Sequence, residues 1–399
     1  MISPPTNLLA GVRVLDLTRV MSGPFCTAML ADLGADVTKI EMPDFGEESR
    51  HFAPHVNGES TYFALLNRGK RSITVNLKSP EGLRIICDLA LRADVLVENF
   101  RPGVMERLGL GQNALQELNP RLIYASISGF GQTGPFRDWP AFDLVIQAMS
   151  GLMSLTGEPD GRATAVGESI ADVATGMFAA WGIAAALYDR ERTSRGRYLE
   201  VAMLDSVFSM LLTSLARRLF TDRTPARVGN RHPETYPVDS FPTRDGDIVL
   251  VGFSDHVFRQ LMQCIGRPEL ADDLRFCTNR SRNDHEAELR NVIESWTRGL
   301  TQAEALEQLR VADVPAAPVW TLDHLLASGH LRARGMVQEG TNAALGKIPL
   351  VPQPVQFSGS SHPVLMRVPI LGEDTDAVLR TELGMTESNI AELRVAKAI

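Results

Sequence analysis

Short apolar segments and helix-like segments alternate through the first third of the chain. The apolar segments are rich in β-branched residues and bounded by turn-forming residues, a pattern that predicts strands. These predicted strands are Gly11–Leu17, Gly34–Glu41, Ser72–Asn76, Asp94–Glu98 and Leu122–Ser126. The predicted helices between them are Phe25–Leu33, 79–93 (with Ser79 as N-cap and Pro80 first in the helix), Val104–Leu108 and Asn113–Leu118. This alternation favours an α/β fold with a Rossmann-like open parallel sheet.

Three turns follow these predicted strands at their carboxyl ends. They are Arg19–Pro24, Asn99–Gly103 and the glycine-rich Gly129–Pro135. Ligands of open α/β sheets collect at this edge, so we expect the three turns to form one binding rim. No G-x-G-x-x-G follows the first strand, which argues against a dinucleotide redox cofactor. The rim is therefore expected to hold another kind of ligand.

A long apolar segment, Gly167–Ala186, differs from the rest of the chain. It begins with small and polar residues, and it holds no charged residue from Val173 to Tyr188. The uncharged run is shorter than a comfortable membrane span, and it is rich in Gly and Ala. We therefore expect a buried helix of a folded domain. Asp172 lies at its start. A carboxylate there either caps the helix or is a reactive group beside an apolar site, and the residues alone leave both interpretations open.

The remainder of the chain predicts a second domain and a return to the first. After a strand at Tyr198–Met203 and a helix at Leu204–Phe220, the segment Asp222–Val238 is rich in Arg and Pro and is typical of a linker. The further predicted strands are Asp239–Phe241 and Ile248–Val251, and two segments, Val351–Pro354 and Val368–Ile370, are expected to be extended. The further predicted helices are Val257–Ile265, His285–Thr297, Gln302–Ala312, Asp374–Leu383 and Glu387–Ala398. We expect a large domain in residues 1–220, a linker in 221–239, a small α+β domain in 240–320, and a linker with a C-terminal return to the large domain in 321–399.

Composition narrows the classes of function. The net charge of 40 − 48 = −8 argues against nucleic acid as the main partner. The N-terminus lacks the pattern of a signal peptide, and the widely spaced Cys26, Cys87, Cys264 and Cys277 are typical of unbridged thiols in a reducing compartment, so we expect a cytoplasmic protein. No metal-binding constellation, G-x-S-x-G elbow or phosphate-binding P-loop stands out. These observations indicate an α/β enzyme with an anionic ligand.

Six stretches of the sequence together carry a resemblance to a known family. They are LLAGVRVLDLTRVMSGPFCTAMLADLGADVTKIE, NRGKRSITVNLKSPEG, ADVLVENFRPGVMERLGLG, SISGFGQTGP, FDLVIQAMSGLMSLTG and SIADVATGMFAA. From about Leu9 to its C-terminus, the chain resembles the class III CoA transferases, the family of formyl-CoA and carnitine CoA transferases. STYFALLNRGKRSI and GFGQTGP resemble the branch that moves CoA from succinyl-CoA to dicarboxylic acids.

The resemblance implies a nucleophilic aspartate, and the matching residue is Asp172. It implies transfer of CoA from an acyl-CoA donor to a carboxylic acid through an aspartyl-CoA thioester, which is covalent catalysis. Coenzyme A then enters as a substrate, and no tightly bound cofactor or metal is implied. The residues that match CoA-binding positions are Val20, Met21, Ser22, Leu77, Lys78, Asn99, Phe100, Arg101, Arg107, Phe142 and Asp143. The resemblance further implies an interlocked homodimer, with no nucleic-acid or membrane partner.

Two alternatives remain open at this point. One is an acyl-CoA racemase or epimerase of the same fold, although related racemases carry a histidine where this chain has Phe142, and proton exchange needs an acid/base pair. The other is a non-catalytic CoA-binding subunit, against which the intact Asp172 argues. His232, in GNRHP, is a candidate contact for an acceptor carboxylate and equally a linker residue.

Overall fold

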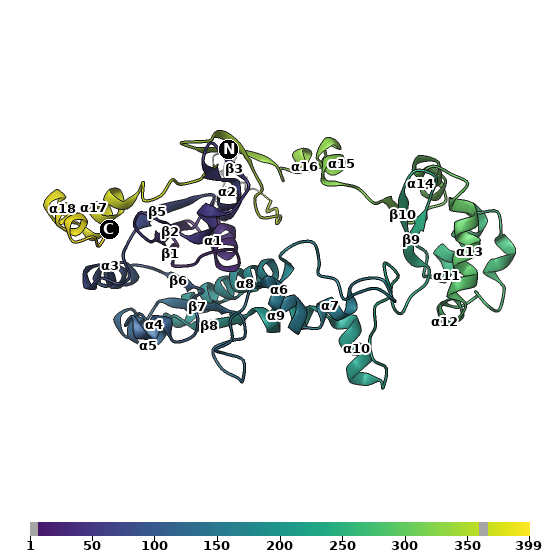
Figure 1. Ribbon diagram of the computed structural model, residues 1–399, viewed down its shortest axis with the longest axis horizontal. Helices are drawn as coiled ribbons and strands as arrows, with labels where there is room; N and C mark the ends of the chain where they lie inside the picture. The colour runs from purple at the N-terminus through teal and green to yellow at the C-terminus, as the bar shows by residue number, and fades with distance from the viewer. Residues whose placement is uncertain (1–6, 359–365) are drawn as a thin grey trace. The chain divides into compact units, whose positions relative to one another are not determined.

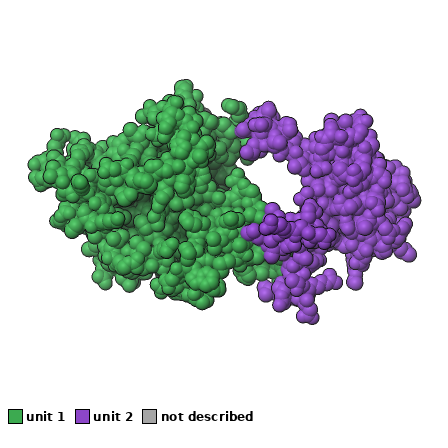
Figure 2. Space-filling model, in the orientation of Figure 1, with its two compact units in different colours: residues 1–152, 165–215, 331–399 green, residues 153–164, 216–330 purple. Residues whose placement is uncertain are grey.

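The computed structural model describes residues 7–358 and 366–399, and the chain divides into two compact units. Unit 1 comprises Met1–Leu152, Ala165–Leu215 and Leu331–Ile399, and unit 2 comprises Met153–Thr164 and Ala216–His330 (Figure 2). The sequence analysis assigns the short segment 153–164 to the large domain, whereas its contacts place it in unit 2. The chain returns to unit 1 at Leu331, so the C-terminal segment completes the unit that the N-terminus begins.

Unit 1 is built on a six-stranded parallel sheet, and the predicted Rossmann-like architecture is confirmed (Figure 1). Its strand order is β5-β2-β1-β6-β7-β8. The strands are β1 (Arg13–Asp16), β2 (Asp36–Glu41), β5 (Lys70–Thr74), β6 (Val95–Glu98), β7 (Ile123–Ser128) and β8 (Tyr198–Ala202). The chain leaves β1 toward β2 on one side and later continues at β6 on the other, with Val14 paired to both Val37 and Val95. The order therefore reverses between β1 and β6, which is where ligands bind in such sheets.

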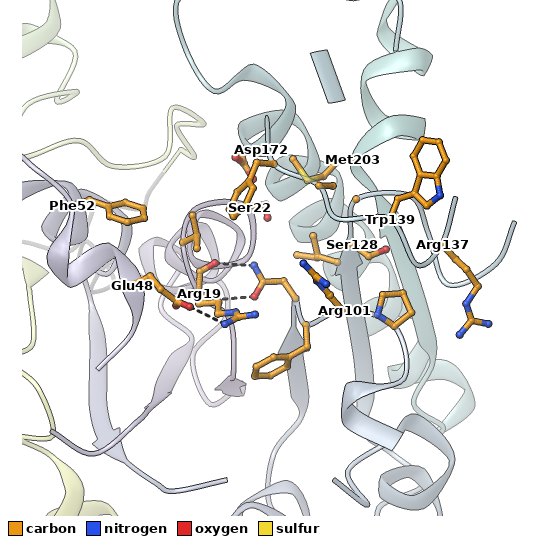
Figure 3. Close-up of a pocket in the computed structure, with 18 residues that line it drawn as sticks. Arg19, Ser22, Glu48, Phe52, Arg101, Ser128, Arg137, Trp139, Asp172 and Met203 are labelled. Atoms are coloured by element: carbon orange, nitrogen blue, oxygen red, sulfur yellow. Dashed lines mark hydrogen bonds and ion pairs between the residues drawn. The ribbon is translucent and has the colours of Figure 1, made fainter. Parts of the chain in front are cut away.

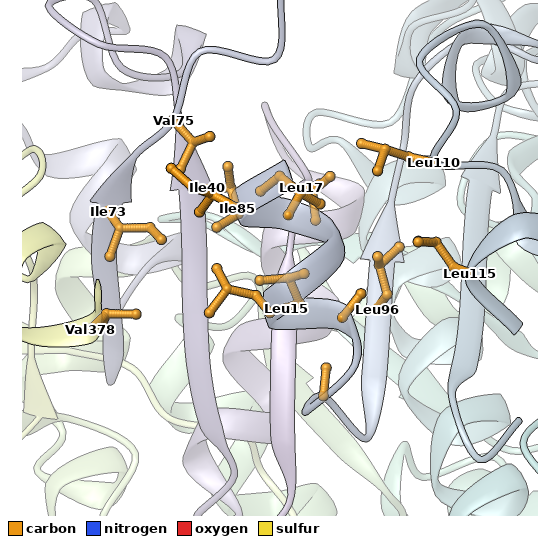
Figure 4. Packing of buried hydrophobic residues seen from close by; sticks show 14 of the residues in the cluster. Leu15, Leu17, Ile40, Ile73, Val75, Ile85, Leu96, Leu110, Leu115 and Val378 are labelled. Carbon is orange, nitrogen blue, oxygen red and sulfur yellow. The ribbon is translucent and has the colours of Figure 1, made fainter. Parts of the chain in front are cut away.

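Both faces of this sheet are buried, because successive side chains of each strand point to opposite sides. Val14 and Val97 pack with residues of α1 (Ser22–Asp32) and α8 (Ile170–Thr193). On the other face, Leu15 and Leu96 pack with α3 (Pro80–Ala90) and with α17 (Thr375–Leu383), as Figure 4 shows. The elements that complete this second face are α4 (Val104–Arg107), α5 (Gln112–Leu118) and α18 (Glu387–Val395).

Helix α8 packs closely along α1, and a glycine permits this approach. A Cβ on Gly176 would lie 2.7 Å from the carbonyl oxygen of Ser22. By length and composition α8 could cross a membrane, but 56% of its apolar window is buried within the structure. The expectation of a buried core helix is in keeping with this packing, and the helix starts of α1 and α8 lie close together.

Several predicted boundaries are wrong. Helix α1 begins at Ser22 rather than Phe25, because Pro24 is tolerated in a first turn whose N–H groups have no intrahelical partner. The predicted helix Leu204–Phe220 is two helices, α9 (Met203–Met210) and α10 (Leu212–Phe220), separated at Leu211. Residues Val351–Pro354 and Val368–Ile370, expected to be extended, lie outside the strands.

The sequence analysis also missed short elements of the described chain. Among them are 3-10 helix η1 (Glu48–His51), β3 (His55–Val56), β4 (Glu59–Ser60), α2 (Thr61–Leu66), α6 (Asp143–Met149), α7 (Leu152–Leu155), α15 (Leu322–Ala327), α16 (His330–Ala333), β12 (Gln338–Asn342), β13 (Gly346–Leu350) and β14 (Met366–Arg367). Most are too short to show a period of their own. Two of them, α2 and α6, contribute to the site described below.

Unit 2 has its own sheet and its own core. Its antiparallel sheet has the order β11-β10-β9. Its elements are β9 (Val238–Pro242), β10 (Asp247–Val251), β11 (Ala316–Pro318), α11 (Asp255–Cys264), 3-10 helix η2 (Pro268–Ala271), α12 (Asn279–Asp284), α13 (Glu286–Thr297) and α14 (Gln302–Val311). Phe241, Ile248 and Leu289 lie in its apolar core. The fully buried Arg282 donates hydrogen bonds to the backbone carbonyls of Tyr236 and Phe276. The guanidinium therefore fixes loop segments that lie outside the sheet.

Candidate active site

A cavity of about 250 Å³ lies in unit 1 at the carboxyl ends of β1, β6 and β7 (Figure 3). It is therefore located at the switch point of the strand order and at the three turns that the sequence analysis places on one rim. The residues that line it are Arg19, Val20, Ser22, Glu48, Phe52, Asn99, Phe100, Arg101, Pro102, Ile127, Ser128, Gly129, Arg137, Trp139, Ala141, Phe142, Asp172 and Met203.

Asp172 reaches this cavity from the first turn of α8. The N-cap residue of the helix is Ser169, and Asp172 is the third helical residue. The interpretation of Asp172 as the helix cap is therefore wrong, and the carboxylate is left for the cavity. Figure 3 shows it beside Ser22, at the start of α1. The first turn of α1 thus lies beside the carboxylate that the first turn of α8 carries, although the two helices are distant in the sequence.

The surroundings of Asp172 raise its pKa to about 6. Burial is the main cause, the negative charge of Asp143 adds to it, and hydrogen bonding from the side chain and backbone of Ser22 acts in the opposite direction. The carboxylate is therefore ionised at neutral pH but more basic than an ordinary aspartate. A partly desolvated, basic carboxylate next to an open cavity is suited to attack an electrophilic carbon.

The backbone after β1 is held in an unusual conformation by side chains from elsewhere. Asn99 accepts a hydrogen bond from the Arg19 N–H at 2.9 Å and donates one to the Arg19 carbonyl at 2.8 Å. Glu47 accepts from the Val20 N–H at 3.0 Å. Val20 has φ +67°, which is rare for a β-branched residue and costs on the order of 1–3 kcal/mol. We infer that Asn99 and Glu47 hold this loop so that Val20 and Ser22 face the cavity.

A buried ionic network lies beneath this loop. The Lys70 ammonium group is 3.0 Å from Asp16, and the Lys39 ammonium group donates to the Thr18 carbonyl at 2.8 Å. Burial would raise the pKa of Asp16, but the charges of Lys39 and Lys70 and hydroxyl hydrogen bonds lower it to about 2. Asp16 therefore stays ionised at working pH, and the network anchors the turn from below.

Three guanidinium groups, those of Arg19, Arg101 and Arg137, line the cavity. Arg19 forms an ion pair with Glu48 at 2.8 Å and lies over the ring of Phe100. Arg137 is 3.3 Å from its neighbour Asp138. Guanidinium groups bind phosphates and carboxylates in a planar, bidentate manner. The cavity thus joins a basic carboxylate with a positive wall suited to an anionic ligand.

The structure brings seven of the residues singled out from the sequence to this cavity and leaves five outside it. The seven that line the cavity are Val20, Ser22, Asn99, Phe100, Arg101, Phe142 and Asp172. Of the five outside it, Met21 is the N-cap residue of α1, and Leu77 packs against the core. The side chains of Lys78, after the edge strand β5, and of Arg107, at the end of α4, are exposed. The side chain of Asp143 bonds the start of α8 instead of lining the cavity.

Sequence reasoning missed several residues of the site. Tyr62, on α2, lies close enough to Asp172 that the aspartate charge, after burial, raises the pKa of the phenol to about 12. Arg137 and Trp139 come from the loop after β7, and Glu47 precedes η1. The quoted segment STYFALLN contains Tyr62 but gave no role for it. Glu47 shows no local signal, because its partner, the Val20 N–H, is 27 residues away.

Comparisons with known proteins give one consistent result. The family model described as CoA-transferase family III matches residues 9–375. The chain is 42% identical to "Acetyl-CoA:oxalate CoA-transferase" of Acetobacter aceti, covering 90% of this chain and 91% of the relative. It is 38% identical to "Succinate--glutarate CoA-transferase" of Agrobacterium fabrum, covering 93% and 94%. The solved structure of a CAIB/BAIF family protein from Brucella suis superposes with a TM-score of 0.82 at 35% identity, covering 94% of this chain and 99% of the other.

Proposed function

Because the chain belongs to CoA-transferase family III and is a CoA transferase, we propose that it moves CoA from succinyl-CoA to a dicarboxylic acid through a thioester on Asp172. The observation that carries this proposal is the position of Asp172. Its carboxylate lies in the cavity at the rim of the sheet, with a pKa raised to about 6. Among the relatives, the Agrobacterium fabrum protein is named for succinate and glutarate, which supports this class of donor and acceptor.

The chemistry proceeds by four exchanges at carbonyl carbon. The Asp172 carboxylate attacks the acyl carbonyl of the donor, the C–S bond breaks, and a mixed anhydride and CoA thiolate form. The thiolate attacks the aspartyl carbonyl of the anhydride, which releases the donor acid and leaves the aspartyl-CoA thioester. The acceptor carboxylate attacks this thioester and expels the thiolate. The thiolate then attacks the acceptor carbonyl of the new anhydride, which releases acceptor-CoA and restores Asp172.

The positive wall of the cavity has two tasks in this scheme. We assign Val20, Ser22, Asn99 and Phe100 to the CoA chain near the sulfur, and Arg101, with Arg107 beyond it, to the phosphates. Arg19 and Arg137 are then left to hold carboxylates of the donor and acceptor acids. Phe142 supplies an apolar wall and no proton acceptor, which favours transfer over racemisation.

Intact-mass spectrometry tests the thioester route. Protein incubated with succinyl-CoA and no acceptor should gain the mass of CoA less one water, on the peptide that contains Asp172. Treatment with borohydride should reduce this thioester, and the Asp172→Ala variant should show neither change. The absence of an adduct with succinyl-CoA and other acyl-CoA donors, in protein that still binds CoA, contradicts the proposal. A panel of acceptor acids then identifies the second substrate.

We also propose a cytoplasmic homodimer of the interlocked kind. In support, α8 presents large apolar side chains away from its buried face, with Trp181 72% and Tyr188 70% exposed. Exposed Leu144 and Val145 on α6 and Phe208 on α9 extend this apolar surface over elements that contact α8. A contiguous apolar surface of this kind marks an interaction site. Light scattering should give twice the mass of one chain, and Trp181→Glu should yield monomer.

A further inference from the structure

The helix that carries Asp172 is capped by a side chain from another element. Within the described chain, the N-cap residue Ser169 gives α8 no side-chain hydrogen bond. Instead, one carboxylate oxygen of Asp143 accepts hydrogen bonds from the N–H of Ala171 at 2.8 Å and of Asp172 at 3.3 Å. Asp143 is the first residue of α6, so a carboxylate 29 residues away in the sequence replaces the local cap. This carboxylate is bonded directly to the backbone of the nucleophile.

A buried glutamine fixes the second oxygen of Asp143. The Gln147 side chain is 1% exposed, and its amide nitrogen donates to Asp143 at 2.6 Å and to the Glu168 carbonyl at 3.2 Å. Its amide oxygen accepts from the Val166 N–H at 2.9 Å. Gln147 therefore joins α6 to the segment just before α8 through three hydrogen bonds. Such bonds from a buried amide fix the geometry of the groups they connect.

The charge of Asp143 also acts on the nucleophile. An aspartate in the first turn of a helix ordinarily has a lowered pKa, because the helix dipole favours the anion. Here burial and Asp143 outweigh that effect, and Ser22 of α1 opposes them. The other ionisable groups around this point are Tyr62 on α2, whose phenol senses Asp172 and Asp143, and the carboxylates of Glu47 and Glu168. Among the described residues that line the cavity, the cationic side chains are those of Arg19, Arg101 and Arg137.

We propose that Asp143, fixed by Gln147, is a positioning residue that holds the start of α8 and places a negative charge beside the Asp172 carboxylate. This inference rests on the proposed role of Asp172 as the nucleophile. It assigns Asp143 to the backbone and charge of the nucleophile, in place of the contact with CoA that the family resemblance implies. A more basic carboxylate is a stronger nucleophile, so the capping charge increases the rate of the first attack.

Three variants and one control test the inference in single-turnover formation of the Asp172 adduct, followed from pH 4.5 to 8. Asp143→Asn keeps an oxygen for the two N–H groups and removes the charge. Asp143→Ala removes both, and Gln147→Leu removes the support of the carboxylate. The matched control is Asp205→Asn, which removes an exposed charge from the first turn of α9, outside the cavity.

The variants are expected to separate the two effects. Asp143→Asn should move the half-maximal pH downward by about 0.5–1 unit, since a like charge has been removed. Asp143→Ala should lower the plateau rate by about 10–100-fold, because misplacing a catalytic group by 1 Å has a cost of that size. Gln147→Leu should fall between wild type and Asp143→Ala. The dissociation constant for CoA should change less than 3-fold throughout, and Asp205→Asn should match the wild type.

Two results overturn the inference, and neither depends on the thioester route failing. One is a pH profile and plateau of Asp143→Asn and Asp143→Ala equal to those of the wild type. The other is a loss of rate that follows melting temperature alone, with an unmoved pH profile in Asp143→Asn. If the wild-type protein forms no adduct, the proposed function is contradicted. The wild-type measurement alone shows this, so the two failures are distinguishable.

Discussion

Helices α1 and α8, which begin at the cavity, start differently from several helices elsewhere in the chain. Helices α3, α11, α14 and α18 are each capped by the hydroxyl of their own N-cap residue, Ser79, Ser254, Thr301 and Thr386 respectively. In the part of the chain that the structure describes, α1 and α8 receive no such hydrogen bond from their N-cap residues Met21 and Ser169. The N–H groups at these two helix starts are left for other partners.

This difference shows where the chain gives up local stability. A self-capped helix start satisfies its own N–H groups and gains about 1 kcal/mol. At the start of α8 the cap comes from Asp143, so its charge lies beside Asp172. At the start of α1 the preceding loop is held by Asn99 and Glu47 in a strained conformation. At the start of α8 a non-local side chain therefore performs the task that local caps perform at α3, α11, α14 and α18, while Asn99 and Glu47 fix the loop that precedes α1.

The largest expected effect is that of Asp172→Asn, which removes the proposed nucleophile. CoA transfer should fall by about 1,000-fold or more, measured as steady-state rate with succinyl-CoA and an acceptor acid. The same variant should be more stable at pH 7 by up to about 3 kcal/mol, since the native pKa of about 6 lies above the ordinary value and burial opposes the charge. The gain should be absent near pH 4, where the carboxyl is protonated, and equal stability at pH 7 would contradict the raised pKa.

Asn99→Ala should have the next largest effect, because it releases the Arg19 backbone. The strained conformation at Val20 is then free to relax, and kcat/KM for acyl-CoA should fall by about 10–100-fold. The affinity for CoA, measured by calorimetry, should weaken in the same variant. If kcat/KM stays within 2-fold of wild type, the loop does not need this support.

Ser22→Ala should have a smaller and directional effect. Hydrogen bonding from Ser22 lowers the pKa of Asp172, so its loss should raise the half-maximal pH of transfer by about 0.5–1 unit. Below pH 6 the rate should fall by about 3–10-fold, with little change at pH 8. Asp143→Asn shifts the profile in the opposite direction, so the pair provides an internal control. Ser209→Ala, which removes a hydroxyl bonded within α9, should leave the profile unmoved.

The smallest effect on activity is expected for a self-capped helix. Thr301→Ala removes the capping box of α14 in unit 2, so urea denaturation should show a loss of about 1 kcal/mol in the unfolding of that unit. The transfer rate at 25 °C should equal that of wild type. A matching loss of rate would show that local caps also serve the site, and the comparison between the two kinds of helix start would fail.

The sequence by itself determined the sheet and much of the rim, and it singled out Asp172 as the candidate nucleophile. Alternating apolar runs placed the strands within about two residues, because side-chain period and burial on both faces are written locally in each strand. Ser79 and Pro80 placed the start of α3 for the same local reason. The family resemblance singled out Asp172 and six other residues that line the cavity.

Only the tertiary structure decided what surrounds these residues. The cap of α8 could not be found from the sequence, since Asp143, which accepts from the Asp172 N–H, is 29 residues away. The pKa of Asp172 depends on burial, on Asp143 of α6 and on Ser22 of α1. Tyr62 and Glu47 join the site through short elements that carry no period of their own. Local pattern fixes secondary structure, whereas the desolvation and charge that make a carboxylate reactive arise from contacts between distant segments.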